Sequence, residues 1–210
     1  MIKRLIIYLR QLLKELEEID IPEPVNDYGR GEMYTPKWGI IVPHEKSKRG
    51  ARTHSSVQPP VYEYDYGLKL GDFLSDKLPY KTRDTGGVYQ AAKDLITLGC
   101  DATIEPHLNA YNGKAHGYEI LVLAGDSLSK EYALNIISSY EAKYPERRKR
   151  QGDGIKEIKK GDRGYYNLKN SKNAGAKIAI LTELFFIDNP DEYMEPIEMS
   201  NFLREVLIVD

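Results

Sequence analysis

The chain has 210 residues, of which 30 are basic and 32 acidic, and its formal net charge is −2. This length suits one compact domain with a sizeable core. Hydrophobic residues make up 41% of the chain and charged residues 30%, a balance that excludes a disordered tail. No apolar run approaches the ~20 residues that span a bilayer, and the near-zero charge argues against a general nucleic-acid-binding protein. The single cysteine, Cys100, excludes an internal disulfide framework and a cysteine-based zinc cluster.

The first twenty residues predict an amphipathic helix, because apolar side chains recur along one face from Ile2 to Ile19. We expect this apolar face, within residues 2–19, to pack on the domain, to self-associate or to dock on a partner. Residues 21–37 contain three prolines and two glycines and predict a linker. The apolar run Leu5 to Leu9 is too short for a secretory signal. We therefore expect residues 1–37 to be a helix and linker, residues 38–210 to be the main domain, and synthesis to be cytoplasmic.

From residue 38 onwards, short apolar runs alternate with longer amphipathic segments, which predicts an α/β layer fold. Strands are predicted at 38–42, 81–83, 102–105, 118–123 and 177–182. Helices are predicted from Pro59-Pro60 to about residue 78, and at 84–98, 129–144 and 201–206. The buried stripe predicted for the first of these helices consists of Tyr62, Tyr66, Leu70, Phe73, Leu74 and Leu78.

Ionisable side chains follow three of the predicted strands: His44 follows WGIIVP, His107 follows ATIEP and Glu183 follows IAILT. Glu63 lies in the first turn of a predicted helix. Because ligands bind at the carboxyl ends of strands in open α/β sheets, these four residues could form one site. Two imidazoles and one carboxylate are the ligands of many catalytic zinc sites, and another carboxylate would act as a general base. Each histidine alone is also compatible with a hydrogen-bonded loop residue.

Five segments of the chain resemble, in order and spacing, those of one enzyme family. They are IIVPHEKSKRGA, EYDYGLKLGDFLSDKL, KTRD, CDATIEPHLNAYNGKAHGYEILVL and GYYNLKNSKNAGAKIAILTELFFIDNPDEY. Over residues 38–207 the chain is similar to the zinc-dependent N-acetylmuramoyl-L-alanine amidases, the cell-wall amidases of bacteria and their phages. The resemblance implies a single α/β domain with a mixed, mostly parallel central sheet flanked by helices.

The resemblance also implies a site and a reaction. His44, Glu63 and His107 would hold one zinc ion, Glu183 would be the catalytic carboxylate, and Asn109 would orient the site or contact substrate. The implied reaction is hydrolysis of the amide bond between N-acetylmuramic acid and L-alanine in peptidoglycan. A phage lytic or tail-associated enzyme that acts on the cell wall is the expected setting.

The chain departs from the family pattern close to these residues. The positions that differ, where glycine or serine is usual, are Pro43, Glu45, Lys46, Glu105 and Leu184. The loop 46–58 is an insertion before Glu63, so Glu45 or Asp65 are alternative ligands to Glu63. Two other functions stay open: a related zinc hydrolase that acts on another amide or peptide, and an inactive wall-binding or structural module of the same fold.

Other polar residues have simpler interpretations. We expect His54 to be exposed in the inserted loop, His116 to be structural, Arg83 to pair with a buried carboxylate, and Cys100 to be a small buried side chain. Residues 143–163 contain nine basic and four acidic residues, whereas residues 183–210 contain eight acidic residues and one basic. These blocks predict solvated loops and a helix face, or a basic surface that helps to hold an anionic substrate.

Overall fold

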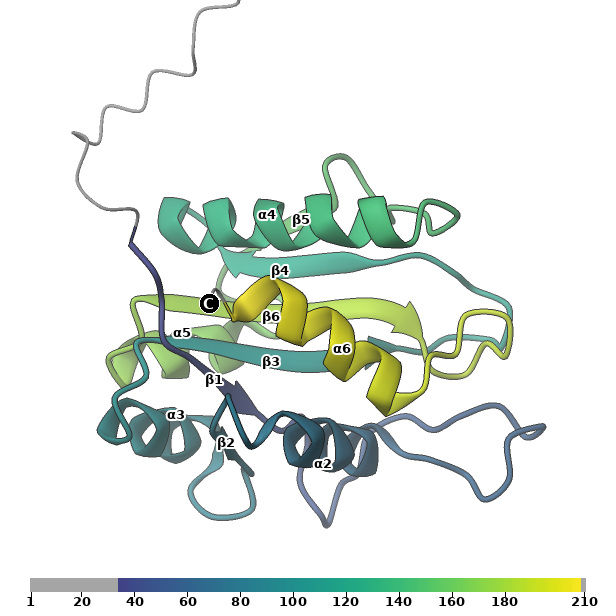
Figure 1. Cartoon of the computed structure of the whole chain (residues 1–210), viewed down its shortest axis with the longest axis horizontal. Helices are drawn as coiled ribbons and strands as arrows, with labels where there is room; N and C mark the ends of the chain where they lie inside the picture. The colour runs from purple at the N-terminus through teal and green to yellow at the C-terminus, as the bar shows by residue number, and fades with distance from the viewer. Residues whose placement is uncertain (1–33, 209–210) are drawn as a thin grey trace, which may run out of the picture. The chain divides into compact units, whose positions relative to one another are not determined.

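The computed structural model describes residues 34–208, and the part from Thr35 onwards is built around one six-stranded sheet (Figure 1). The strand order is β2-β1-β3-β6-β4-β5. The strands are β1 (Trp38–Ile41), β2 (Tyr80–Lys81), β3 (Ala102–Asn109), β4 (Glu119–Leu123), β5 (Ile155–Ile158) and β6 (Ile178–Phe186). The predicted N-terminal helix and most of the predicted linker lie outside the described residues.

The sheet is mixed and mostly parallel, as the family resemblance implies. Strands β2, β1, β3 and β6 run parallel, whereas β4 pairs antiparallel with β6, and β5 runs parallel with β4. The two central strands, β3 and β6, are buried along their whole length. Burial on both faces explains why the sequence of β6 is an almost continuous apolar run.

Helices cover both faces of this sheet (Figure 1). On one face, α2 and α4 both pack against α6, and on the other face α3 packs against α5. The helices are α2 (Glu63–Leu74), α3 (Gly87–Thr97), α4 (Ser127–Lys143), α5 (Tyr165–Asn173) and α6 (Pro196–Leu207). Among the described residues, no helix is long and apolar enough to cross a membrane.

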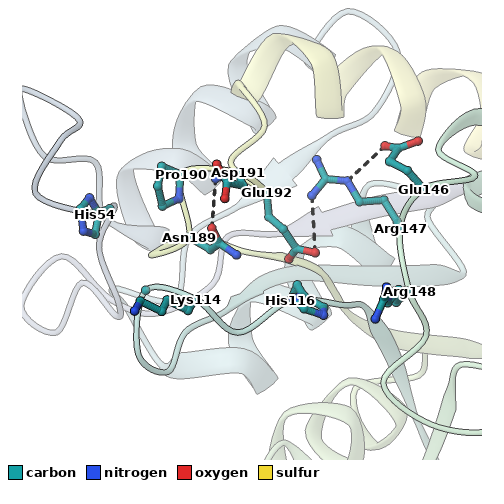
Figure 2. A pocket seen from close by; sticks show the side chains of 11 residues that line it. His54, Lys114, His116, Glu146, Arg147, Arg148, Asn189, Pro190, Asp191 and Glu192 are labelled. Atoms are coloured by element: carbon teal, nitrogen blue, oxygen red, sulfur yellow. Dashed lines mark hydrogen bonds and ion pairs between the residues drawn. The ribbon is translucent and has the colours of Figure 1, made fainter.

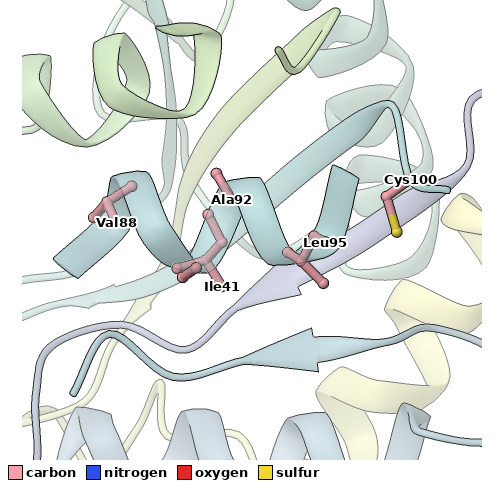
Figure 3. Packing of buried hydrophobic residues seen from close by; sticks show 6 residues of the cluster. Ile41, Val88, Ala92, Leu95 and Cys100 are labelled. Atoms are coloured by element: carbon pink, nitrogen blue, oxygen red, sulfur yellow. The ribbon is translucent and has the colours of Figure 1, made fainter. Parts of the chain in front are cut away.

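The packing of α3 on β1 illustrates how the core is built (Figure 3). Val88, Ala92 and Leu95 follow one another at steps of four and three residues, so they share one helix face and lie over Ile41. Cys100 completes this cluster and is buried, as predicted. Gly39 of β1 lets the helix approach the strand closely, since a Cβ atom there would lie only 2.9 Å from the Leu95 side chain.

Two predictions about helix α2 are wrong. The helix begins at Glu63 and not at Pro59, because Tyr62 is extended and pairs with Arg52 of the inserted loop. Phe73 is not part of the buried stripe, since its side chain is 44% exposed. The buried residues of α2 follow one another at steps of one to three positions and are Glu63, Tyr64, Tyr66, Gly67, Leu70, Gly71 and Leu74.

The central strands are longer than predicted, with a direct consequence for the site. Because β3 continues to Asn109 and β6 to Phe186, His107 and Glu183 lie within strands and not after them. The prediction of a strand ending at residue 105 is wrong, since polar residues continue on the buried faces. The short edge strand β5 lies inside the block 143–163, for which the sequence predicts solvated loops, and α5 has no predicted counterpart.

Candidate active site

Three of the predicted ligands, His44, Glu63 and His107, converge at one place. Each offers one ligand atom, and these atoms lie within 4.8 Å of one another. Glu63 Oε2 is 3.0 Å from His44 Nε2 and 3.3 Å from His107 Nδ1. This donor set fits a divalent metal ion with an open coordination position. Asp65, an alternative ligand in the sequence analysis, pairs instead with Arg49.

The Glu63 carboxylate is held in place from two sides at the start of α2. The backbone N–H of Ala51 donates to Oε1 at 2.9 Å, and that of Leu108 donates to Oε2 at 3.2 Å. Burial acts to raise the pKa of Glu63, but hydrogen bonds and charge from His107 and His44 outweigh burial and lower this pKa well below its usual value. The carboxyl group therefore stays ionised, which is the form that binds metal.

The turn around His44 is built without the glycines that are usual in the resembled family. His44 itself has a left-handed backbone, with φ at +63°. Gly50 lies across from its ring, where a Cβ atom would be 2.5 Å from His44 Nε2. Gly67 of α2 makes similar room for Pro43, since a Cβ atom there would be 2.5 Å from the Pro43 ring. Glycines on neighbouring segments thus supply the space that the turn needs.

A buried network surrounds the far side of His107. His107 Nε2 is 3.0 Å from Glu105 Oε1, and Arg83 pairs with the same carboxylate. This confirms the expectation that Arg83 pairs with a buried carboxylate. Burial lowers the pKa of His107, but the charges of Glu105 and Glu63 outweigh it and raise the pKa to about 9 without a metal ion.

Glu183 lies beside His107 on the neighbouring strand. In the parallel β3–β6 pair the two residues are register partners, so their side chains share one face of the sheet. On the other side, Glu119 of β4 is the register partner of Glu183. Burial raises the pKa of Glu183, and Glu119 raises it further, although Arg163 and His107 act against the shift. Glu183 is therefore a carboxylate poised to accept a proton closer to neutral pH than usual.

Asn109 connects Glu183 to a second charged pair. Its Nδ2 atom donates to the Glu183 backbone oxygen at 3.3 Å, and its Oδ1 atom accepts from Arg150 at 2.7 Å. Arg150 also donates to Glu119 at 2.6 Å and lies 3.6 Å from Glu183. Neither Glu119 nor Arg150 was predicted as a site residue from the sequence. Glu119 had a signal, because a carboxylate directly before the apolar run ILVL must be paired or reach water.

The basic block 143–163 and the acidic block 183–210 pair with each other in several places. Lys143 pairs with Glu205, Arg147 lies 3.6 Å from Glu192, and Arg150 and Arg163 both lie near Glu183. Arg163 remains 70% exposed at 3.7 Å from the Glu183 carboxylate. Whether the block also helps to hold an anionic substrate therefore stays a prediction.

A pocket of about 590 Å³ opens among the loops at this edge of the sheet (Figure 2). His54 of the inserted loop lies on one side of it, and Arg147 extends toward Glu146 and Glu192 on the other (Figure 2). His54 is exposed, as predicted, and His116 lines the pocket and is not part of the metal group. Two of the loops that line the pocket follow β3 and β6, the strands of His107 and Glu183.

Comparisons with known proteins bear on the fold. The sequence matches no family model and no curated protein sequence. Among solved structures, the N-acetylmuramoyl-L-alanine amidase AmiC2 of Nostoc punctiforme aligns over 83% of this chain and 96% of its own, with a TM-score of 0.58 and 12% identity. The chain has the fold of an N-acetylmuramoyl-L-alanine amidase. The fold implied by the five segments is thereby confirmed.

Two further structures share this amidase fold. The catalytic domain of the CD27L endolysin, which targets Clostridia difficile, aligns over 82% of this chain and 96% of its own, with a TM-score of 0.51 and 23% identity. Cwp6 from Clostridium difficile aligns over 83% of this chain with a TM-score of 0.56 and 20% identity. The chain corresponds to only 28% of the length of Cwp6. At these identities the likeness establishes the fold alone.

Proposed function

We propose that the protein is a zinc-dependent peptidoglycan amidase that hydrolyses the amide bond between N-acetylmuramic acid and the L-alanine of the stem peptide. The proposal rests on one observation: in an amidase fold, three converging ligand atoms lie beside a buried carboxylate with a raised pKa. His44, Glu63 and His107 are the proposed zinc ligands, one ion per chain. Glu183 is the proposed catalytic residue.

The residues have separate tasks in this reaction. Bound zinc supplies Lewis-acid chemistry, because it polarises an amide carbonyl and makes water a better nucleophile at neutral pH. Glu183 accepts a proton from the attacking water as the new C–O bond forms at the lactyl carbonyl. It then donates that proton to the alanine nitrogen as the C–N bond breaks. The products are a free lactyl carboxylate and a stem peptide with a free amino terminus.

The surroundings of Glu183 suit an anionic substrate. Arg163 is mostly exposed near the catalytic carboxylate, and exposed Lys114 and Arg148 line the nearby pocket. Stem peptides and the lactyl product both carry carboxylates, which these cations would attract. Asn109 supports the site through its bonds to Glu183 and Arg150. The endolysin likeness supports action on the cell wall, with a phage lytic or tail-associated enzyme as the proposed setting.

The complete ligand group favours an active enzyme over an inactive wall-binding module. A zinc hydrolase that cuts another amide would share the same ligands and differ in the segments 46–58 and 146–164. Identification of the cleavage products separates that alternative from the amidase.

The metal requirement is tested by removing and restoring zinc. We expect the purified protein to bind one zinc ion per chain, to release new amino groups from purified peptidoglycan, to lose this activity in a chelator, and to regain it with zinc. His107→Ala is expected to lose both zinc and activity, since it removes a ligand. Full activity in the zinc-depleted protein, or a folded protein that binds no zinc, would contradict the proposal.

A further inference from the structure

We infer that Glu105 is a positioning residue that holds His107 so that Nδ1 faces the metal ion and Nε2 carries the hydrogen. This inference rests on the metal site of the proposed function. It extends the site beyond the three ligands to a buried carboxylate. The consequence is that zinc affinity depends on a residue that does not touch zinc.

The two ring nitrogens of His107 face two different carboxylates. Nδ1 is 3.3 Å from Glu63 Oε2, on the side where the ligand atoms converge. Nε2 is 3.0 Å from Glu105 Oε1. The ring is almost fully buried and packs edge-on against His44, with the ring centroids 4.8 Å apart. The ring is thus fixed with one nitrogen for the ion and the other for the carboxylate.

Glu105 is itself held in place by two other elements. Its side chain is 4% exposed and pairs with Arg83, which precedes α3. Asn167 of α5 donates its amide N–H groups to both carboxylate oxygens, at 3.2 and 3.1 Å. Positions 105 and 107 lie two residues apart on β3, so their side chains share one face and stand next to each other. The position of the Glu105 carboxylate is therefore fixed by Arg83 and Asn167 as well as by His107.

The chemistry explains why such a carboxylate matters. A carboxylate that accepts the second ring N–H of a metal-binding histidine fixes the tautomer, orients the ring and makes the other nitrogen a stronger ligand. Glu105 does not fit as a fourth ligand, because it lies on the Nε2 side of the ring and its oxygens already accept from Arg83 and Asn167. Its part is to orient the ligand and not to bind the ion.

Zinc affinity of folded, metal-free protein tests the inference directly. We would measure the dissociation constant by competition with a chromophoric chelator in wild type, Glu105→Ala and Glu105→Gln. We expect the alanine variant to bind about 10–100-fold more weakly. The glutamine variant keeps an acceptor oxygen but loses the charge, so we expect a smaller, severalfold loss. Thr103→Val, a buried position on the same face of β3, is the matched control and should leave the affinity unchanged.

A second readout reports the tautomer, which a merely structural residue would not determine. Imidazole ¹⁵N resonances of the zinc-bound protein should show His107 coordinated through Nδ1 and protonated at Nε2. Loss of Glu105 should weaken this preference for one tautomer. Coordination through Nε2 in wild type would overturn the inference.

The outcomes distinguish this inference from the proposed function. A wild-type protein that binds no zinc would overturn the proposed metal site and this inference with it. Tight zinc binding by wild type together with equal affinity in Glu105→Gln would overturn the inference alone. If Glu105→Ala does not fold, the glutamine variant and the wild-type resonances still decide the question.

Discussion

Among single side chains, Glu183 is the one on which turnover is expected to depend. Glu183→Gln keeps the size and hydrogen-bonding shape of the side chain but cannot accept a proton from water. We expect kcat to fall by about 10²–10⁴-fold, the range for loss of a general acid–base group. Peptidoglycan hydrolysis and bound zinc should be measured on the same sample. Loss of zinc from this variant, or activity close to that of wild type, would contradict the assignment.

The raised pKa of Glu183 predicts how activity depends on pH. As the base, Glu183 must be ionised, so activity should rise with pH through the pKa of this group. Because that pKa is raised, the acid limb of kcat/KM should lie at a higher pH than an ordinary glutamate carboxyl would give. Glu119→Gln removes a negative charge that raises this pKa, so it should move the limb to lower pH.

A surface variant provides the control for this pH shift. Glu157→Gln removes an exposed carboxylate of β5 that pairs with Lys130, and it should leave the acid limb in place. An acid limb that does not move in Glu119→Gln would show that another group limits activity at low pH.

At the scale of elements, the inserted loop 46–58 shapes the metal site through Gly50. This glycine has φ at +77°, and a Cβ atom would lie 2.5 Å from the His44 ring. We expect Gly50→Ala to cost about 1–2 kcal/mol of stability for the left-handed backbone, and also to weaken zinc binding by displacing His44. Thermal unfolding and chelator competition measure the two effects.

Gly152, which lies outside the inserted loop, supplies a matched control for the Gly50→Ala substitution. Its φ is +45°, but a Cβ atom there would meet nothing within 4 Å. Gly152→Ala should therefore cost stability without changing zinc affinity. Equal zinc affinity in Gly50→Ala and wild type would mean that the loop does not constrain His44.

The elements that could be predicted from the sequence are those whose apolar residues form clear runs or periodic stripes. The apolar runs of β1, β4 and β6 and the periodic stripes of α3 and α4 were all visible. The apolar pattern did not predict the strand end where polar side chains are buried in pairs. Strand β3 continues through Glu105 and His107 because each has a buried partner, and such partners are not visible in the sequence. The pattern also failed for α5, whose sequence is mostly polar and whose buried residues are Leu168 and Ser171.

The candidate site was predictable in part for a related reason. Strand ends and a resemblance located His44, Glu63, His107 and Glu183, which the structure brings to one edge of the sheet. The position of Glu119 beside Glu183 could not be predicted, because it depends on the pairing of β4 with β6, which lie far apart in the chain. The register between strands that lie far apart in the chain cannot be predicted from local composition.

At the scale of the whole molecule, the metal site joins separate parts of the fold. Its proposed ligands come from the segment after β1, the first residue of α2, and β3. An ion bound only by the folded chain stabilises it, by about 2.7 kcal/mol when free zinc is 100 times its dissociation constant. We expect zinc to raise the melting temperature of wild type and Glu183→Gln alike, but not of His107→Ala. An equal rise in His107→Ala would place the zinc elsewhere.

Mass spectrometry of the reaction products identifies the bond that the protein cleaves. Purified peptidoglycan would be digested by the zinc-loaded protein, with a parallel digest in a chelator. We expect chelator-sensitive release of stem peptides with a free L-alanine amino terminus, and glycan chains with free lactyl carboxylates. Products cut within the peptide or within the glycan would contradict the proposed amidase activity. Intact peptidoglycan after treatment with folded, zinc-loaded protein would also contradict it.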